Sequence, residues 1–184
     1  MMAKLDRRIQ KTQEALKNAV IELMGEKDFD NITIQDIADR ANLNRGTIYL
    51  HYQDKYDLLD KLIESHINEI AEMDKWACDE EWMDAFIPYF EYFKQNHLFF
   101  STMLTSKGAG PSYFRTRLLA HCIAGFQCEI DRESGKNNNL KDDVILQFAG
   151  TAYAGVIEWW IINGMPYPPE VMAKQVGALL ERSL

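Results

Sequence analysis

The residues of this chain that could bind a ligand by specific chemistry gather in one segment, residues 33–55. The segment contains hydroxyl, amide, guanidinium, imidazole and ammonium groups, and residues 40–53 include no carboxylate. Such groups hydrogen-bond to phosphate oxygens and to the edges of bases. We therefore expect the segment to contact nucleic acid, and the candidate residues are Thr33, Asn44, Arg45, Gly46, Thr47, Tyr49, Leu50, His51 and Lys55.

The chemistry of these side chains suggests different roles. Arg45 can present two N–H donors to O6 and N7 of a guanine, and Gly46 would let the backbone approach the duplex. The phosphate candidates are Thr33, Tyr49, His51 and Lys55; Thr33 and Lys55 stand at predicted helix N-termini, where anions are favoured. The competing interpretation is that all of these are ordinary capping and surface residues.

The elements around this segment are predicted to be helices. Apolar spacing indicates an amphipathic helix over residues 5–25, and Thr33 with Asp36 forms a capping-box signature for a short helix that ends near residue 41. Asn44 is a good N-cap for a second short helix over residues 45–52. Two short helices joined by a tight turn make a helix-turn-helix. A longer helix over residues 55–73 then leads away from it.

The string TIQDIADRANLNRGTIYLHYQDK at residues 33–55 closely resembles the DNA-binding region of the TetR/AcrR family of bacterial transcription regulators. In that family the pattern TIxxIAxxAxVSxGTxYxxFxxK follows an amphipathic first helix. Asn44 stands where the family usually has Ser, and Tyr52 stands where it has Phe. Both changes preserve the local interactions, because Asn also caps helices and Tyr also fills an aromatic site. The resemblance is specific over about residues 8–63.

The resemblance implies an all-α fold with two parts. Residues 1–54 would form an N-terminal three-helix DNA-binding domain with the helix-turn-helix, and residues 55–184 a C-terminal helical domain for ligand binding and dimerisation. In the C-terminal part, helical patterns cover residues 81–96, 99–104, 112–133, 140–163 and 170–184. Pro88 would either kink the first of these or delay its start, since proline removes a helix hydrogen bond.

Composition sets limits on the compartment and the partners. The chain has 184 residues, of which 47% are hydrophobic, and a net charge of −8. Residues 1–61 carry −1 and residues 62–184 carry −7, so the acidic excess lies away from the expected DNA-binding part. An odd number of cysteines, three, favours reduced thiols and a cytoplasmic location. The longest charge-free run, residues 144–157, is shorter than a membrane span, so we expect no membrane partner.

Other chemistry finds little support in the sequence. His121, Cys122 and Cys128 offer three metal ligands, but residues 121 and 122 point about 100° apart on a helix, and no fourth ligand is spaced nearby. Buried thiols are the simpler interpretation. No nucleophile elbow, zinc-protease motif or phosphate-binding glycine loop is present. We therefore expect no metal, no cofactor and no enzymatic activity.

Aromatic residues crowd the middle of the chain, and two explanations remain open for them. Core packing must account for most. An apolar pocket for a small-molecule effector would also be built from aromatic walls with a few polar tips, and the resemblance implies such a cavity. The candidate lining residues are Phe86, Tyr89, Phe90, Phe93, Met103, Tyr153 and Glu158. Alternatively, Glu158 faces solvent or pairs with Arg115 or Arg117.

The segment 140–163 is apolar on nearly every side, so one side needs a cover outside the chain's own core. We expect a second copy to supply it, with the last two helices of both chains forming a four-helix interface. The predicted contact residues are Phe148, Ala152, Val156, Trp160, Met172, Val176, Leu179 and Leu180.

Together these features predict a homodimeric, ligand-responsive transcriptional regulator, most simply a repressor. It would bind a palindromic double-stranded operator and would be released by a small molecule. The alternative is a helical protein-interaction or metabolite-binding module that has lost DNA binding. The effector, the operator and the regulated genes are not encoded in any pattern of the sequence.

Overall fold

The structure, a computed structural model, describes residues 2–77, 85–106, 108–127 and 139–183. These residues form nine α-helices and one short 3-10 helix and contain no strand, which confirms the all-α prediction. In chain order the elements are α1 (Met2–Glu26), η1 (Phe29–Asn31), α2 (Ile34–Arg40), α3 (Arg45–Tyr49), α4 (Lys55–Ala77), α6 (Ile87–Gln95), α7 (His97–Thr105), α8 (Ala109–Gly125), α10 (Asp142–Ile162) and α11 (Pro169–Ser183).

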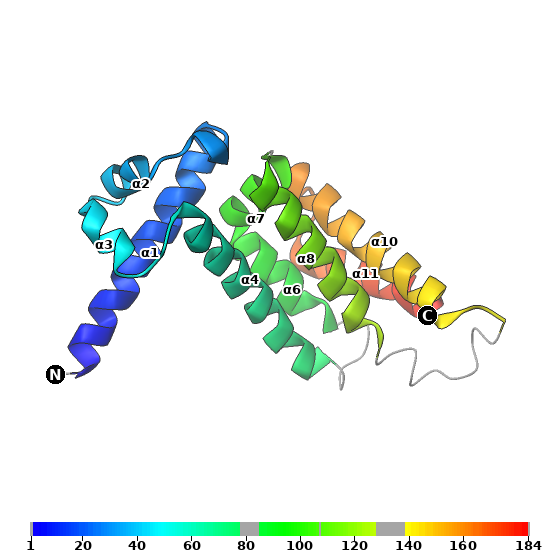
Figure 1. Cartoon of the computed structure of the whole chain (residues 1–184). Helices are drawn as coiled ribbons and strands as arrows, with labels where there is room; N and C mark the ends of the chain where they lie inside the picture. The colour runs from blue at the N-terminus through cyan, green and yellow to red at the C-terminus, as the bar shows by residue number, and fades with distance from the viewer. Residues whose placement is uncertain (1, 78–84, 107, 128–138, 184) are drawn as a thin grey trace.

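The first three α-helices form a small unit at one end of the molecule, and α4 runs from it into a larger bundle (Figure 1). The unit is held mainly by apolar packing, with Ile37, Ala38 and Ile48 almost fully buried. Arg40 of α2 also pairs with Glu22 and Glu26 of α1, at N–O distances of 3.2 and 2.8 Å. These pairs are exposed and add little free energy, so they mainly set the orientation of α2 on α1.

The turn between α2 and α3 has the local chemistry that the sequence predicts. Asn42 adopts a left-handed backbone, with φ of 53°, which asparagine tolerates better than most residues. Asn44 then caps α3, and its side-chain oxygen accepts a hydrogen bond of 2.8 Å from the Gly46 N–H. A tight turn and a cap thus place α3 at a defined angle to α2.

Helix α3 is shorter than predicted. It ends at Tyr49 after five residues, rather than at residue 52. The chain tightens there, because the N–H groups of Leu50 and His51 donate to carbonyls three residues back instead of four. Tyr52 still folds inward and is buried, as its spacing from Ile48 predicts.

The larger bundle consists of α4, α6, α7, α8, α10 and α11. Helix α10 packs against α7, α8 and α11, and α11 packs against α6. At the α8–α10 crossing Gly150 is necessary, since a Cβ atom there would lie 2.8 Å from the Cα of Ile123. Pro88 lies in the first turn of α6, so the helix starts late and is not kinked. Residues 81–84 lie outside the described residues.

Helix α10 is the one element of the described chain that is long and apolar enough to cross a membrane. It has 21 residues, and its most apolar window has a mean hydropathy of 1.3, with 39% of that window buried in the molecule. A core helix of a water-soluble protein passes the same test. Its packing against three other helices makes it part of a folded bundle.

Candidate nucleic-acid interface

The outer face of α3 presents side chains that contribute little to the core. Leu50, just after the helix, is 81% exposed, and Tyr49 is 48% exposed. Arg45 and Gly46 are also exposed, while Thr47 and His51 are half-buried. Ile48 fixes the helix from the opposite side and has no exposed surface. The structure thus brings together on and around one short helix most of the residues that were predicted to contact DNA.

Arg45 and Tyr49 form a pair along this face. The guanidinium of Arg45 donates a 3.0 Å hydrogen bond to the hydroxyl of Tyr49. Its carbon atom also lies 5.5 Å from the centre of the Tyr49 ring, within the range of a cation–π contact. Arg45 has five N–H donors, so this contact leaves its other donors available for a base edge.

Lys55 makes contacts inside the chain that the sequence does not predict. Its ammonium group donates to the backbone carbonyls of Phe29, Asp30 and Ile32, at 2.9, 2.9 and 2.7 Å. An ammonium group has three N–H donors, so all of them are used inside the chain. Donation to a DNA phosphate, as the sequence predicts, would require Lys55 to leave one of these carbonyls. Lys55 thus fastens the start of α4 to η1.

Thr33 is also committed to a local structural role. Its hydroxyl donates to a carboxylate oxygen of Asp36 at 2.8 Å and accepts from the Asp36 N–H at 3.1 Å. Hydrogen bonds from Lys27, and then from Thr33, hold the pKa of Asp36 down at about 2. The only hydroxyl proton of Thr33 is thus used in the cap of α2, and donation to a phosphate, as predicted, would require it to leave Asp36.

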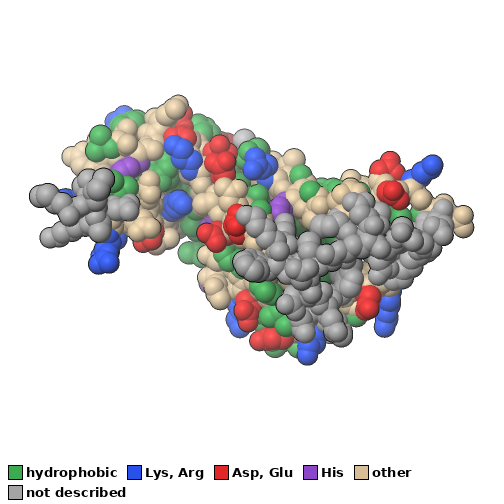
Figure 2. Space-filling model, turned by 90° about the horizontal axis from the view of Figure 1, so that it is seen from below, with side chains coloured by type: hydrophobic (Ala, Val, Ile, Leu, Met, Phe, Trp, Pro, Cys, Tyr) green, Lys and Arg blue, Asp and Glu red, His purple; other side chains and the backbone are tan. Residues whose placement is uncertain are grey.

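A basic group that was not among the candidate residues lies at the same end of the molecule. Arg7, Arg8 and Lys11 are exposed on the N-terminal turns of α1, which extend beyond α3 (Figure 1). Figure 2 shows Lys and Arg side chains at this end. The signal was present in the sequence, because residues 4–11 contain four basic residues and one acidic residue.

The residues predicted to line a pocket are mostly one aromatic cluster in the bundle. Phe86 lies 5.1 Å from Tyr153, and Phe90 lies 5.2 Å from Trp160, measured between ring centres. Met103 has no exposed surface. Tyr89 and Phe93 are buried on the same helix as Phe90. Six of the seven candidates are therefore brought together as a packed core.

Glu158 is the exception among the pocket candidates. Its carboxylate lies 3.4 Å from Nε of Arg115, and both side chains are more than one-third exposed. Arg115 also donates to the carbonyl of Leu104, so the pair joins α7, α8 and α10 at the surface. The prediction that Glu158 lines the aromatic pocket is wrong, and the alternative pairing with Arg115 is confirmed.

The comparisons with known proteins agree with this geometry. Residues 18–62 match the family described as bacterial regulatory proteins, tetR family, and residues 80–182 match the transcriptional regulator C-terminal region. The second match alone covers more than half of the chain. The chain belongs to the TetR family of transcriptional regulators. Regulators of this family are non-enzymatic, soluble DNA-binding proteins that typically act as dimers.

Individual relatives cover different parts of this TetR-family chain. It is 41% identical over 69 residues to the "Uncharacterized HTH-type transcriptional regulator YxbF" of Bacillus subtilis, spanning 37% of this chain and 18% of that protein. It is 24% identical over 196 residues to the "Probable acrEF/envCD operon repressor" of Escherichia coli, with 95% and 86% covered. A TetR regulator from Streptococcus agalactiae has a similar structure, with a TM-score of 0.71, 27% identity, and 98% and 99% of the two chains covered.

Half of the residues predicted for a dimer contact are inside the protomer of this TetR-family regulator. Trp160 has no exposed surface and donates a 2.9 Å hydrogen bond to the Tyr167 carbonyl. Met172, Val176 and Leu180 of α11 are buried as well. Helix α11 lies against α6, and this contact uses the face that was assigned to a partner. The prediction is therefore wrong for these four residues.

The other predicted contact residues lie on or beside a continuous exposed stripe of α10. Phe148 is 65% exposed and Ala152 is exposed, while Val156 is half-buried; Leu179 of α11 is also exposed. The stripe extends through residues that the prediction missed. Its members recur at intervals of three and four residues on one side of α10: Val144, Phe148, Ala152, Gly155, Trp159 and Ile162.

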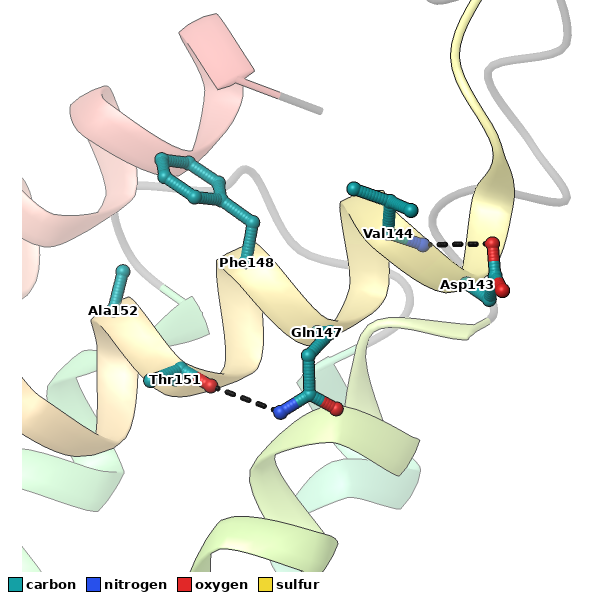
Figure 3. Close-up of a pocket in the computed structure, with 6 residues that line it drawn as sticks. All are labelled: Asp143, Val144, Gln147, Phe148, Thr151 and Ala152. Atoms are coloured by element: carbon teal, nitrogen blue, oxygen red, sulfur yellow. Dashed lines mark hydrogen bonds between the residues drawn. The ribbon is translucent and has the colours of Figure 1, made fainter.

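An open groove of about 780 Å³ follows the N-terminal half of this stripe. Figure 3 shows Val144, Phe148 and Ala152 along it, with the ring of Phe148 directed toward α11. On its polar side, Gln147 donates to the hydroxyl of Thr151 at 3.2 Å. All of its lining residues belong to α10, so the groove is a surface feature and is separate from the aromatic cluster.

His66 lies where the small unit of α1, α2 and α3, the DNA-binding unit, meets the bundle. Its ring stacks on Phe99, with 3.8 Å between ring centres, and its Nδ1 lies 2.7 Å from the Tyr92 hydroxyl. Burial, and to a smaller extent the nearby charge of Lys17, lowers the pKa of His66 to about 4. Lys17 of α1 donates to Ser65 at 3.1 Å, so α1, α4, α6 and α7 all contribute to this junction.

Proposed function

We propose that the protein is a cytoplasmic, non-enzymatic repressor that binds a palindromic operator as a homodimer. In this proposal residues 1–54 hold the DNA, and residues 55–184 bind a small-molecule effector and the second copy. The observation that carries the proposal is the exposed surface of α3 and the residue after it, where Arg45, Tyr49 and Leu50 stand in a stretch without carboxylates. Exposed side chains of this size contribute nothing to the packing of the core.

The residues on and around α3 would make different contacts with the DNA. A helix of this diameter fits the major groove, in which Arg45 can reach a guanine and Leu50 can pack on a thymine methyl group. Asn44, Gly46, Thr47 and His51 surround these two and would contact the duplex at the edge of the groove. The exposed Arg7, Arg8 and Lys11 of α1 would add phosphate contacts that do not depend on sequence.

The exposed stripe of α10 supports the homodimer. Phe148 of this apolar helix is 65% exposed. Each apolar group that stays in contact with water forgoes the stabilisation that burial would give it. Pairing α10 and α11 with the same helices of a second copy would cover the stripe, and a two-fold axis would present two α3 helices to the two halves of a palindrome.

The effector step follows from contacts between the DNA-binding unit and the bundle. Ser106, after α7, donates to the Met24 carbonyl of α1 at 3.4 Å, and Lys55 fastens α4 to η1. An effector that enters the aromatic cluster of Phe86, Phe90 and Tyr153 would shift α6 and α7. The separation of the two α3 helices would then no longer match grooves about 34 Å apart.

Two relatives support repression as the direction of control. The Escherichia coli relative, which matches nearly the whole length of this chain, is named a probable operon repressor. A second relative is named a class G tetracycline repressor protein, from Vibrio anguillarum. A dimer that occupies a promoter represses by excluding polymerase, and release by an effector restores transcription.

The test is salt-dependent binding to DNA. The full-length protein would select duplexes from a random-sequence pool, and fluorescence anisotropy would measure the Kd of the selected duplex at several salt concentrations. We expect a palindromic consensus and a steep negative slope of log K against log salt. Arg45→Ala should weaken the selected duplex by about 1–3 kcal/mol, whereas Arg117→Ala, on α8, should leave it unchanged.

The alternative function, a helical interaction or metabolite-binding module that has lost DNA binding, makes the opposite prediction. Such a protein would enrich no consensus, and Arg45→Ala would behave like Arg117→Ala. That result would overturn the proposed function.

A further inference from the structure

We infer that Tyr49 is a positioning residue for Arg45: it holds the guanidinium over the outer face of α3 so that Arg45 reads one guanine. The inference rests on the proposed function, because it concerns how the same surface discriminates between sequences. Tyr49 itself need not touch a base for this role.

The direction of the Arg45 side chain makes such a residue necessary. Arg45 is the first residue of α3, and Cα–Cβ bonds in a helix tilt toward its N-terminus. An unrestrained Arg45 would therefore extend past the start of the helix, away from the face that carries Tyr49 and Leu50. Its bond to the Tyr49 hydroxyl, one turn later, turns the guanidinium back over that face.

The contact also leaves Arg45 competent to bind a base. One of its N–H donors goes to Tyr49, and the described residues give it no other hydrogen bond or ion pair. A bidentate contact with guanine O6 and N7 needs two donors, and four remain. Because the side chain is already ordered before binding, less conformational entropy is lost when the complex forms.

The same chemistry occurs a second time, far from α3, and provides a matched control. On α8 the guanidinium of Arg117 donates a 3.0 Å hydrogen bond to the Tyr113 hydroxyl, and its carbon lies 5.7 Å from the ring centre. This pair also spans four residues of an exposed helix surface. Tyr113→Phe therefore removes an equivalent hydrogen bond without touching the DNA-binding unit.

The experiment is a double-mutant cycle on the duplex selected by the wild-type protein. Kd values would be measured for wild type, Arg45→Ala, Tyr49→Phe, the double variant and Tyr113→Phe. Each protein would be tested on the selected duplex, on all its single base-pair substitutions, and at several salt concentrations. Tyr49 is half exposed, so Tyr49→Phe should keep the helical fold, which circular dichroism would verify.

We expect Tyr49→Phe to raise the Kd for the selected duplex roughly three- to tenfold. Discrimination should fall at the one base pair where Arg45→Ala also reduces it, and the salt slope should not change. Tyr49→Phe should add nothing in the Arg45→Ala background. Tyr113→Phe should match wild type.

Three results would overturn the inference while leaving the proposed function in place. Tyr49→Phe could weaken every duplex equally, with a shallower salt slope and the same loss in the Arg45→Ala background; Tyr49 would then be a phosphate ligand. Tyr49→Phe could have no effect, or Arg45→Ala could leave the base preference unchanged. If wild type selects no duplex, the proposed function fails, and this inference fails with it.

Discussion

Lys55 has a structural role that its position in the sequence does not indicate. A lysine at a helix N-terminus in a DNA-binding motif is a reasonable phosphate ligand. In the folded chain its ammonium group is enclosed by three carbonyls and lies 5.0 Å from the centre of the Phe29 ring. Those carbonyls come from a segment more than 20 residues away in sequence, which no local pattern identifies.

Lys55→Met should therefore affect stability more than DNA binding. We expect the free energy of unfolding to fall by about 2 kcal/mol, because charge-assisted hydrogen bonds are lost and three carbonyls lose their donor. The salt slope of DNA binding by the folded protein should not change. Urea denaturation and anisotropy would measure the two quantities.

Lys61→Met is the control for this prediction. Lys61 pairs with Asp57 on the exposed side of α4, and its loss should cost less than about 0.5 kcal/mol. A stable Lys55→Met protein with a salt slope lower by one contact would restore the phosphate role of Lys55.

His66 predicts a pH dependence of stability. Its pKa is about 4 in the folded protein, against 6.5 when unfolded, so unfolding takes up a proton at intermediate pH. The free energy of unfolding should fall by about 2 kcal/mol from pH 7.5 to pH 5 through this residue. Asp36 contributes in the same direction only at lower pH, because its unfolded pKa of 3.8 falls to about 2 on folding.

The measurement is urea denaturation of wild type, His66→Gln and His97→Gln at several pH values between 5 and 7.5. His66→Gln should remove most of the slope, whatever its effect on the stability at pH 7.5. His97 is exposed on α7, and His97→Gln should keep the slope. An unchanged slope in His66→Gln would show that the His66 ring takes up its proton as readily in the folded protein as in the unfolded chain.

At the scale of elements, the crossing of α8 and α10 depends on a missing side chain. The two helices approach so closely at Gly150 that a Cβ atom would lie 2.4 Å from Cγ1 of Ile123 and 2.9 Å from its backbone nitrogen. Close backbone contact of this kind permits dense packing of the aromatic residues on either side, and backbone atoms cannot move aside as a flexible side chain can.

Gly150→Ala should lower the free energy of unfolding by about 1–3 kcal/mol through overpacking, despite the better helix propensity of alanine. Thermal denaturation followed by circular dichroism would measure it. Gly25→Ala is the matched control, because a Cβ atom there meets nothing within 4 Å, and it should be neutral or stabilising. Equal behaviour of the two variants would contradict the close crossing.

At the scale of the whole molecule, the apolar stripe of α10 predicts the assembly state. Phe148→Asp places a charge on the apolar stripe that the proposed four-helix interface would cover, so the dimer should dissociate to 21.3 kDa monomers at micromolar concentration. Light scattering would detect it. Selected DNA should then bind far more weakly, since two α3 helices no longer bind together.

Leu98→Asp provides the comparison for the dimer prediction. Leu98 is 49% exposed on α7 and is not part of the stripe, so its replacement should leave the dimer intact. A wild-type protein that scatters as a monomer, or a Phe148→Asp protein that remains a dimer, would refute the proposed interface.

The sequence by itself determined the helical class, the position of most helices and the identity of the DNA-binding segment. Those features depend on interactions within a few residues, such as the Thr33–Asp36 cap, the Asn44 cap and the inward pair of Ile48 and Tyr52. The composite pattern at residues 33–55 therefore predicted the helix-turn-helix well. The early end of α3 at Tyr49 was not predicted, because the chain tightens there through hydrogen bonds to carbonyls three residues back instead of four.

Tertiary structure alone decided which face of each apolar helix is inside. Helix α10 is apolar nearly all round, so its periodicity could not distinguish buried Trp160 from exposed Phe148. That choice depends on where α8 and α11 pack. Long-range contacts likewise assigned Lys55 to distant carbonyls and Glu158 to Arg115. A charged side chain takes the partners that the fold places within reach, and sequence spacing does not encode those distances.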